Sequence, residues 1–267
     1  MTTVLKLGGE QLEDRAAMSR PANGVRALAA EGPLAIVHGG GRAIDADLRA
    51  RGVAPRFVDG VRITDAATLD SVVAVLAGRI NTTFVAALGA ADVDAVGLTG
   101  ADAATALCTP APAIQTTAGE RVNPGLVGIP IDRRPRLLLD LLALRYVPVI
   151  ATIGTTDDGA LLNVNADVLA AHIARVLRAE RLIIAGSTPG VLDASGRTCG
   201  FLDPAGARTM IAAGTARDGM VAKLNAALAA VDGGVRSVWI VDGREAKYDE
   251  GERTMIGAAQ EIADTSC

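Results

Sequence analysis

The chain has 267 residues, of which 50% are hydrophobic and 2% aromatic, and its formal net charge at pH 7 is −4. That length fits one large α/β domain or two lobes, and the apolar fraction is enough for a buried core. The acidic balance and the few aromatic rings argue against a nucleic-acid partner, which favours a basic surface with rings for base stacking. No apolar run approaches the roughly 20 residues of a membrane-spanning helix and no secretory signal is visible, so a cytoplasmic protein without membrane contact is expected.

Short apolar runs alternate with segments of helical periodicity in the first part of the chain. Gly32 and Gly52 follow two of the helical segments and end them. Alternation around Asp59-Gly60 predicts a β-hairpin, and Asp65 offers an N-cap for the next helix. The predicted elements are a strand at 4–7, a helix at 16–31, a strand at 34–37, a helix at 42–51, a hairpin at 57–65 and a helix through 69–76.

The same alternation continues, less regularly, to the C-terminus and predicts an α/β fold with a largely parallel sheet. No linker divides the chain, so two lobes are expected to share one sheet with a cleft across it. Asp157-Asp158-Gly159 predicts a turn. The remaining predicted elements are a strand at 94–98, loops and short hairpins at 106–128, a helix at 136–144, a strand at 147–153, a helix at 166–178, a strand at 181–186, a helix at 219–231 and a final strand at 237–243.

The cysteines and histidines indicate no metal centre. Cys108, Cys199 and Cys267 are widely spaced and odd in number, which favours free thiols over a disulfide or a nucleophile. His38 and His172 are the two histidines of the chain, which leaves little material for a zinc site.

Two glycine-rich turns follow two predicted strands, LGG at 7–9 and HGGG at 38–41. Backbone N–H groups of glycines can approach an anion closely, and the helix predicted after HGGG adds the positive end of its dipole. Tight turns between strand and helix are the alternative explanation of both glycine runs. Neither turn matches the P-loop or the dinucleotide-binding fingerprint.

Three basic side chains lie near ends of predicted elements. Lys6 interrupts the apolar run VLKLGG, and Lys223 lies near the start of a predicted helix, where a cation opposes the helix dipole unless an anion is bound. Arg62 follows the hairpin turn and could hold a carboxylate through two hydrogen bonds. Taken singly, Lys223 and Arg62 also fit a solvated surface position.

The segment NVNAD at 163–167 places two amides and a carboxylate at the start of a predicted helix. Asn165 suits the N-cap and Asp167 the first turn, which is a purely structural explanation. The functional alternative is that Asn163, Asn165 and Asp167 bind substrate or position a cation and the lysines. Ligands of open α/β sheets bind where these groups gather, at the carboxyl ends of the strands.

Nine stretches of this sequence resemble the amino acid kinase family, and within it the acetylglutamate kinases. They occur in the order of the family and cover nearly the whole chain. The stretches are KLGG (6–9), VHGGG (37–41), FVDGVRITD (57–65), AVGLTGAD (95–102), GLVG (125–128), NVNAD (163–167), PGVLD (189–193), GMVAK (219–223) and VDGR (241–244).

The resemblance implies a three-layer α/β/α sandwich with a mainly parallel central sheet. An N-lobe at 1–170 would bind the acyl amino acid and form the dimer, and a C-lobe at 171–267 would bind the nucleotide. The implied activity is transfer of the γ-phosphoryl group of ATP, with Mg²⁺, to the side-chain carboxylate of N-acetyl-L-glutamate in arginine biosynthesis. The chain begins at its first strand, so the resemblance further implies a homodimer without arginine feedback.

The resemblance also implies roles for particular residues. Lys6 and Lys223 would neutralise the transferring phosphoryl group, and Asp167 would orient them, in keeping with the general logic of phosphoryl transfer. The expected acetylglutamate site consists of Gly40, Gly41, Arg62 and Asn163. The expected phosphate and nucleotide site consists of Gly8, Gly9, Ser187, Gly190, Gly219 and Met220.

Two segments depart from the family pattern. Ser187 in AGSTPG stands where the family usually carries the carboxylate of a Thr-Asp pair, and EAKYDEGERT at 245–254 is a shortened C-terminal segment. Two alternatives follow. One is a kinase for another acylated or carrier-linked amino acid, and the other is a catalytically weak member that binds a metabolite.

Overall fold

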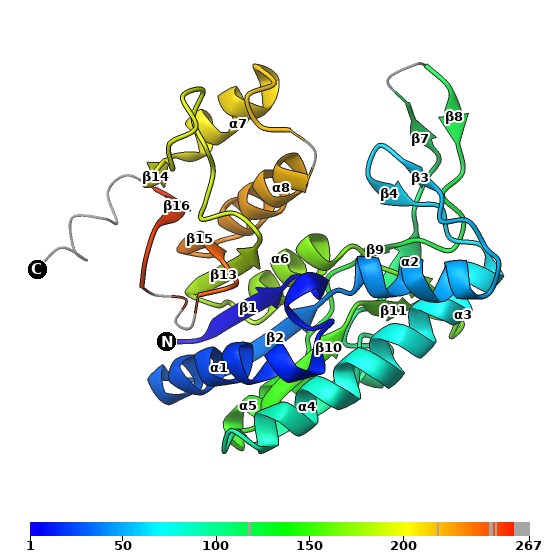
Figure 1. The fold of residues 1–267 in the computed structure, drawn as a ribbon, viewed down its shortest axis with the longest axis horizontal. Coiled ribbons are helices and arrows are strands. Elements are labelled where there is room, and N and C mark those ends of the chain that lie inside the picture. The colour runs from blue at the N-terminus through cyan, green and yellow to red at the C-terminus, as the bar shows by residue number, and fades with distance from the viewer. Residues whose placement is uncertain (117–118, 218, 246–247, 249, 259–267) are drawn as a thin grey trace, which may run out of the picture.

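The computed structural model describes residues 1–116, 119–217, 219–245, 248 and 250–258. An eight-stranded sheet forms its centre and includes both the N-terminal and the C-terminal part of the chain (Figure 1). The predicted α/β class with one shared sheet is confirmed. In their order across the sheet, the strands are β14 (Phe201–Leu202), β16 (Arg253–Gly257), β15 (Ser237–Asp242), β13 (Arg181–Gly186), β1 (Thr3–Leu7), β2 (Leu34–His38), β10 (Val147–Ala151) and β5 (Ala95–Thr99).

The neighbouring strands from β15 to β5 are parallel. β1 lies between β13 and β2, and its Lys6 is level with Ile184 and Val37. β16 pairs antiparallel with β15, and β14 pairs parallel with β16. The prediction that the strand at 237–243 is the last one is therefore wrong, because β16 follows it and widens the sheet.

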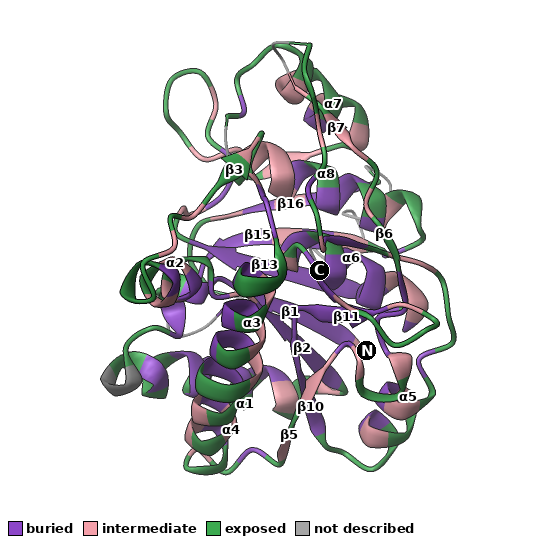
Figure 2. Cartoon of the chain, turned by 90° about the vertical axis from the view of Figure 1, so that its right-hand side faces the viewer, coloured by how far each residue is buried: buried purple, intermediate pink, exposed green. Residues whose placement is uncertain are grey.

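Helices cover both faces of this sheet, so the expected three-layer α/β/α sandwich is confirmed (Figures 1 and 2). Side chains of each strand alternate between two hydrophobic clusters: Val4 and Val37 belong to one, Leu5 and Ile36 to the other. The first cluster packs under α5 (Arg136–Ala143), α6 (Ala166–Val176), α7 (Pro204–Ala212) and α8 (Gly219–Asp232). The second packs under α1 (Ser19–Glu31), α2 (Gly41–Ala50), α3 (Ala66–Val73) and α4 (Thr82–Gly89).

A π-helical segment, η3 (Ala74–Asn81), joins α3 to α4 and makes one helix of 24 residues from Ala66 to Gly89. Its N-cap is Asp65, whose carboxylate accepts from Thr68 N at 2.9 Å. By length and composition alone this helix could cross a membrane, which the sequence-based expectation of no such segment did not anticipate. Val72 and Phe84 are fully buried against the sheet, so the helix belongs to the core of the fold.

Short ladders and turns complete the fold. They are β3 (Phe57–Val58) with β4 (Val61–Arg62), β6 (Cys108–Pro110) with β9 (Gly128–Pro130), β7 (Ile114–Gln115) with β8 (Arg121–Val122), β11 (Ile153–Thr155) with β12 (Leu161–Asn163), and the 3-10 turns η1 (Gly9–Gln11), η2 (Arg15–Met18) and η4 (Asp102–Ala104). The predicted hairpin turn is confirmed: Asp59 and Gly60 both have positive φ, 46° and 78°. The strand predicted at 147–153 divides at Thr152 into β10 and β11.

Two of the three cysteines lie in the described part of the chain, and both are free thiols, as predicted. Cys108 is buried, and burial raises its pKa to about 11. Cys267 lies outside the described residues. These two thiols are therefore structural side chains rather than activated nucleophiles.

Candidate active site

The parallel strands bring their carboxyl ends to one edge of the sheet, and the predicted charged groups meet there. Lys6 lies near the end of β1 and Asp167 in the first turn of α6. Their side chains form an ion pair of 3.0 Å between Lys6 Nζ and Asp167 Oδ1, with 8% and 11% of the two side chains exposed. Two charges so far removed from water are tolerated because each has the other as its partner.

The local sequence explains how Asp167 is placed. Asn165 is the N-cap of α6, and its side-chain oxygen accepts from Asp167 N at 2.9 Å and from Val168 N at 3.1 Å. The capping role considered for Asn165 is thus confirmed. It fixes the first turn of the helix, from which the carboxylate of Asp167 reaches Lys6.

Lys223 lies in the first turns of α8 and belongs to the same charge group. Its Nζ donates to Gly219 O at 3.4 Å, and its aliphatic chain passes over Gly186, where an added Cβ would lie 3.0 Å from Lys223 Cε. Burial lowers the pKa of Lys223, and the Lys6 ammonium lowers it further, while Asp167 and Glu10 act in the opposite direction. Asp167 thus pairs directly with Lys6 and acts on Lys223 at longer range, which leaves positive charge available for an anion.

The two glycine turns touch each other. A Cβ on Gly9 would lie 2.5 Å from Gly40 Cα, and a Cβ on Gly40 would lie 2.4 Å from Ile80 Cδ1. Close packing thus requires glycine at Gly9, whose neighbour is backbone, whereas the neighbours of Gly40 are the ends of the Ile80 and Leu76 side chains. Gly8 differs, because the space of its missing side chain is taken by the carboxylate of Glu10, whose Oε1 would be 2.3 Å from a Cβ there. Glu10 is not among the residues that the sequence singles out.

Arg62 and Asn163 make polar contacts with the start of α2 and with the hairpin segment. Arg62 Nη1 pairs with Asp45 Oδ1 at 2.5 Å and Nη2 donates to Gly41 O at 3.2 Å. The guanidinium also stacks on the Phe57 ring at 4.5 Å. Asn163 Nδ2 donates to a hydroxyl, that of Thr64, at 3.1 Å. These contacts connect the hairpin to the start of α2. The role of Asp45 in this connection could not be predicted from the sequence, where Asp45 is one polar residue of a predicted helix.

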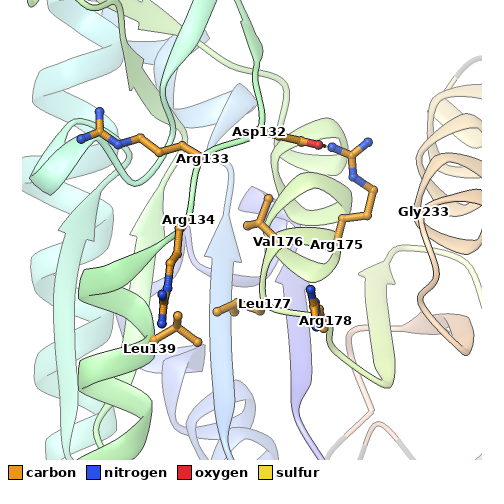
Figure 3. A pocket seen from close by; sticks show the side chains of 9 residues that line it. All are labelled: Asp132, Arg133, Arg134, Leu139, Arg175, Val176, Leu177, Arg178 and Gly233. Carbon is orange, nitrogen blue, oxygen red and sulfur yellow. Dashed lines mark hydrogen bonds and ion pairs between the residues drawn. The ribbon is translucent and has the colours of Figure 1, made fainter.

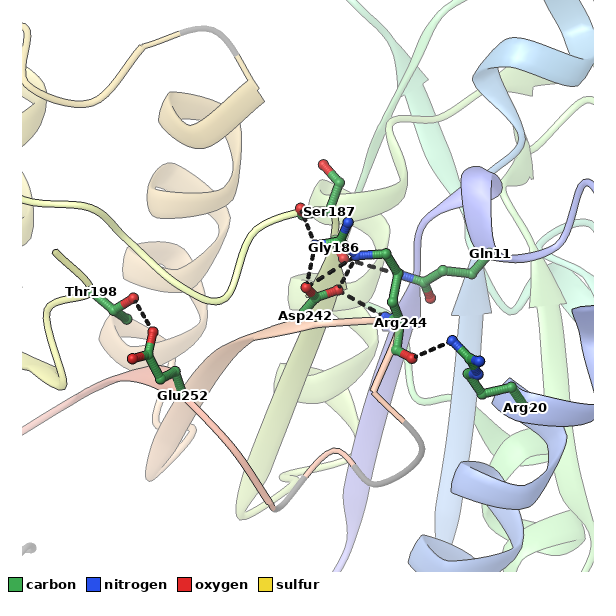
Figure 4. Close-up of polar contacts among 8 residues, drawn as sticks. All are labelled: Gln11, Arg20, Gly186, Ser187, Thr198, Asp242, Arg244 and Glu252. Atoms are coloured by element: carbon green, nitrogen blue, oxygen red, sulfur yellow. Dashed lines mark hydrogen bonds and ion pairs between the residues drawn. The ribbon is translucent and has the colours of Figure 1, made fainter. Parts of the chain in front are cut away.

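Ser187 directly follows β13, beside the end of β15 (Figure 4), and Gly190 lies three residues further along the chain. Ser187 O accepts from Arg244 Nη2 at 3.3 Å, and Arg244 is held by Asp242, whose Oδ1 accepts from Arg244 Nε at 2.9 Å. Asp242 thus brings a carboxylate to this edge, where Ser187 has none. A Cβ on Gly190 would lie 2.5 Å from Thr254 Oγ1, so β16 packs tightly here.

The expected nucleotide residues do not all contact the two lysines. Gly219 does, through its carbonyl, whereas Met220 packs against the hydrophobic core. A cavity of about 1030 Å³ opens beside Asp167, Gly219 and Lys223 and extends to the hairpin tip at Asp59. Its size is that of a pocket for a nucleotide or a substrate of similar size.

The chemistry of these groups fits a phosphorylated ligand. Two ammonium groups and the backbone of glycine turns are donors that phosphate oxygens accept from. Within the described residues, no three His, Cys, Asp or Glu side chains are arranged to hold a metal ion.

Comparisons with known proteins identify the family of the chain. A sequence profile of the amino acid kinase family matches residues 1–242. The chain is 38% identical to an acetylglutamate kinase from Azoarcus sp. (strain BH72), covering 96% of this chain and 88% of that one, and 39% identical to one from Bordetella avium (strain 197N), covering 96% and 89%. The crystal structure of smu.665 from Streptococcus mutans UA159 superposes with a TM-score of 0.80 at 26% identity, covering 96% and 98%. The chain belongs to the amino acid kinase family.

Proposed function

We propose that the chain is an acetylglutamate kinase, which phosphorylates the side-chain carboxylate of N-acetyl-L-glutamate with MgATP in arginine biosynthesis. The observation that carries the proposal is the group of Lys6, Lys223 and Asp167 beside the large cavity. The names of the relatives support the choice of substrate. In the reaction, the carboxylate oxygen forms a bond to the γ-phosphorus while the bond to the β-γ bridging oxygen breaks, giving an acyl phosphate and ADP.

The lysines act by charge in this proposal. Phosphoryl transfer needs positioning and charge neutralisation rather than a covalent nucleophile. Lys6 and Lys223 would bind oxygens of the transferring group, and Asp167 is a positioning residue that holds Lys6. Gly8 and Gly9 would donate N–H groups to phosphate; binding there displaces the carboxylate of Glu10 from its place over Gly8.

The acetylglutamate site is proposed on the N-terminal side of the cleft. Gly40, Gly41 and Asn163 would supply amide donors, and Arg62 would bind the α-carboxylate with the donors that Asp45 and Gly41 leave over. Ser187, Gly190, Gly219 and Met220 would border the nucleotide in the C-terminal part. The division into lobes at 1–170 and 171–267, the homodimer and the cytoplasmic location belong to the same proposal.

One assay tests this function. Purified protein is incubated with ATP, Mg²⁺ and N-acetylglutamate, and the acyl phosphate is trapped with hydroxylamine. Hydroxamate formation is expected, and it would exclude a member that merely binds a metabolite. Formation with a different acylated or carrier-linked amino acid, but not with acetylglutamate, would identify another kinase of the family. If no acylated amino acid yields hydroxamate, the kinase proposal is wrong.

A further inference from the structure

A groove lined by arginines lies between α5 and α6 and plays no part in the proposed reaction. Its volume is about 810 Å³, comparable to that of ligand pockets in other proteins. Arg134 and Arg178 stand on opposite sides in Figure 3, with Leu139 and Leu177 between them. Arg133 and Arg175 also line the groove. Four arginines in the lining of one groove are an unusual concentration of positive charge for a chain whose net charge is −4.

The charges of this arginine groove are mostly uncompensated. Its one carboxylate is that of Asp132, which pairs with Arg175 and lies 3.7 Å from His172 Nδ1. Within the described part of the chain, Arg133, Arg134 and Arg178 have no ion-pair partner. Arginine side chains that line one groove without carboxylate partners favour an anionic ligand, because each planar guanidinium fork matches two phosphate oxygens.

The backbone holds one of these arginines in an unfavourable conformation. Arg178 follows the last turn of α6 with φ of +52°, a position where helices usually carry glycine. This conformation costs free energy in a residue other than glycine. Here it places an exposed guanidinium at the rim of the groove instead of a glycine without a side chain.

We propose that the arginine groove is a second binding site, for a nucleoside di- or triphosphate. Arg133, Arg134 and Arg178 would bind the phosphates, and the base would lie on the apolar floor of Leu139 and Leu177. The concave shape favours a small molecule over an acidic protein, which would need a flatter and wider surface. Because Arg175 lines both the groove and the reaction cavity, a ligand in the groove is expected to affect the neighbouring cleft.

Calorimetric titration with ADP tests the proposal. The wild-type chain is expected to bind two ADP molecules, one in the cleft and one in the groove, and Arg134→Ala/Arg178→Ala to bind one. Loss of two charge-assisted contacts should weaken ADP binding in the groove at least about 30-fold. Arg26→Ala/Arg49→Ala removes the same charge from exposed helix positions and should leave both sites intact.

The outcomes that overturn the proposal are distinct. Identical isotherms for the wild type and Arg134→Ala/Arg178→Ala would show that the groove binds no nucleotide. Equal affinity for inorganic phosphate and ADP would mean an adventitious ion only. Binding of a glutamate-rich peptide, but not of ADP, would make the groove a docking surface for an acidic protein. If the alanine variant does not fold, Arg134→Lys/Arg178→Lys replaces it. This variant keeps both positive charges but lacks the planar guanidinium forks, so undiminished ADP binding by it would also contradict the proposal.

Discussion

At the scale of single residues, the site depends on one carboxylate, Asp167, which pairs with Lys6 and acts on Lys223 at longer range. The ion pair with Asp167 explains why Lys6 is tolerated inside a buried strand, since its ammonium group would otherwise lose water without compensation. Lys223 differs, because its Nζ is otherwise held by a long hydrogen bond to a backbone carbonyl. Lys223 is therefore the group that is freer to follow a phosphoryl group as charge develops on it.

Replacing Lys223 with alanine should lower turnover without preventing substrate binding. A charge used mainly in the transition state is worth about two to three orders of magnitude in kcat. Hydroxamate formation measures turnover, and calorimetry measures binding of N-acetylglutamate, which should be nearly unchanged because Arg62 and Asn163 are retained. Loss of acetylglutamate binding with little change in kcat would show that Lys223 has a different role.

Gly9 and Gly78 provide a matched pair of glycines. Gly9→Ala places a Cβ 2.5 Å from Gly40 Cα, so the backbone of one turn must shift, at about 1–3 kcal/mol of unfolding free energy. Gly78 lies in the long helix with no atom within 4 Å of an added Cβ, so Gly78→Ala should be neutral or stabilising by up to about 1 kcal/mol. Urea unfolding measures both. Equal effects of the two variants would contradict the close contact between the turns.

At the scale of elements, the π-helical segment contacts the HGGG turn through the side chain of its last residue. Asn81, its last residue, donates from Nδ2 to Val149 O at 2.8 Å and lies 3.0 Å from His38 Nε2. Because Nδ2 can only donate, His38 Nε2 accepts and its Nδ1–H donates to Gly39 O at 3.2 Å. The wider π turn thus joins the long helix to two strands and to the glycine turn.

Asn81→Ala should therefore destabilise the fold by roughly 1–3 kcal/mol, because it leaves the buried carbonyl of Val149 without its donor. Thr82→Ala, one residue on and exposed, removes a hydroxyl bonded within the helix and should change stability by less than about 0.5 kcal/mol. Thermal unfolding at neutral pH compares the two. Similar melting temperatures for both variants would show that the Asn81 contacts do not stabilise the protein.

Periodicity was sufficient for most elements and failed for identifiable reasons. Strands such as β1 and β13 are buried on both faces, so their apolar runs stand out in the sequence. α7 was missed although Asp203 caps it and Pro204 begins it, because small residues blur its apolar face. β16 was missed because its position depends on pairing with the distant β15, which no local pattern reveals.

The candidate site was predictable in composition but not in contacts. Lys6, Asp167 and Lys223 could be selected because they lie near the ends of predicted elements and within stretches that resemble the family, although Lys223 alone also fits a solvated surface position. Glu10 over Gly8 and Asp45 beside Arg62 could not, since both contacts arise from tertiary packing between segments that look ordinary alone. For the same reason the arginine groove is divided in the sequence between 132–139 and 175–178.

At the scale of the whole molecule, stability should depend on pH in two separate windows. Burial lowers the pKa of both histidines, His38 and His172, to about 4 from an ordinary value of 6.5. Carboxyl groups such as Asp193 and Asp65 have lowered pKa values because hydrogen bonds favour their charged form. Stability contributed by these carboxylates is present above their unfolded pKa near 3.8 and is lost as pH falls below it. The two kinds of group therefore act at different pH.

Between pH 6.5 and 4 the histidines should dominate the pH dependence. The unfolded chain takes up protons there and the folded chain does not, so the free energy of unfolding falls as pH is lowered, by up to about 3 kcal/mol for each histidine. The contact of His38 with Asn81 also disfavours its protonation in the folded chain, because a protonated Nε2 would place one donor against another, the Nδ2 of Asn81. Urea unfolding at several pH values should show this slope, and His172→Gln should roughly halve it. A flat profile down to pH 4.5 would mean that neither histidine is held neutral by the fold.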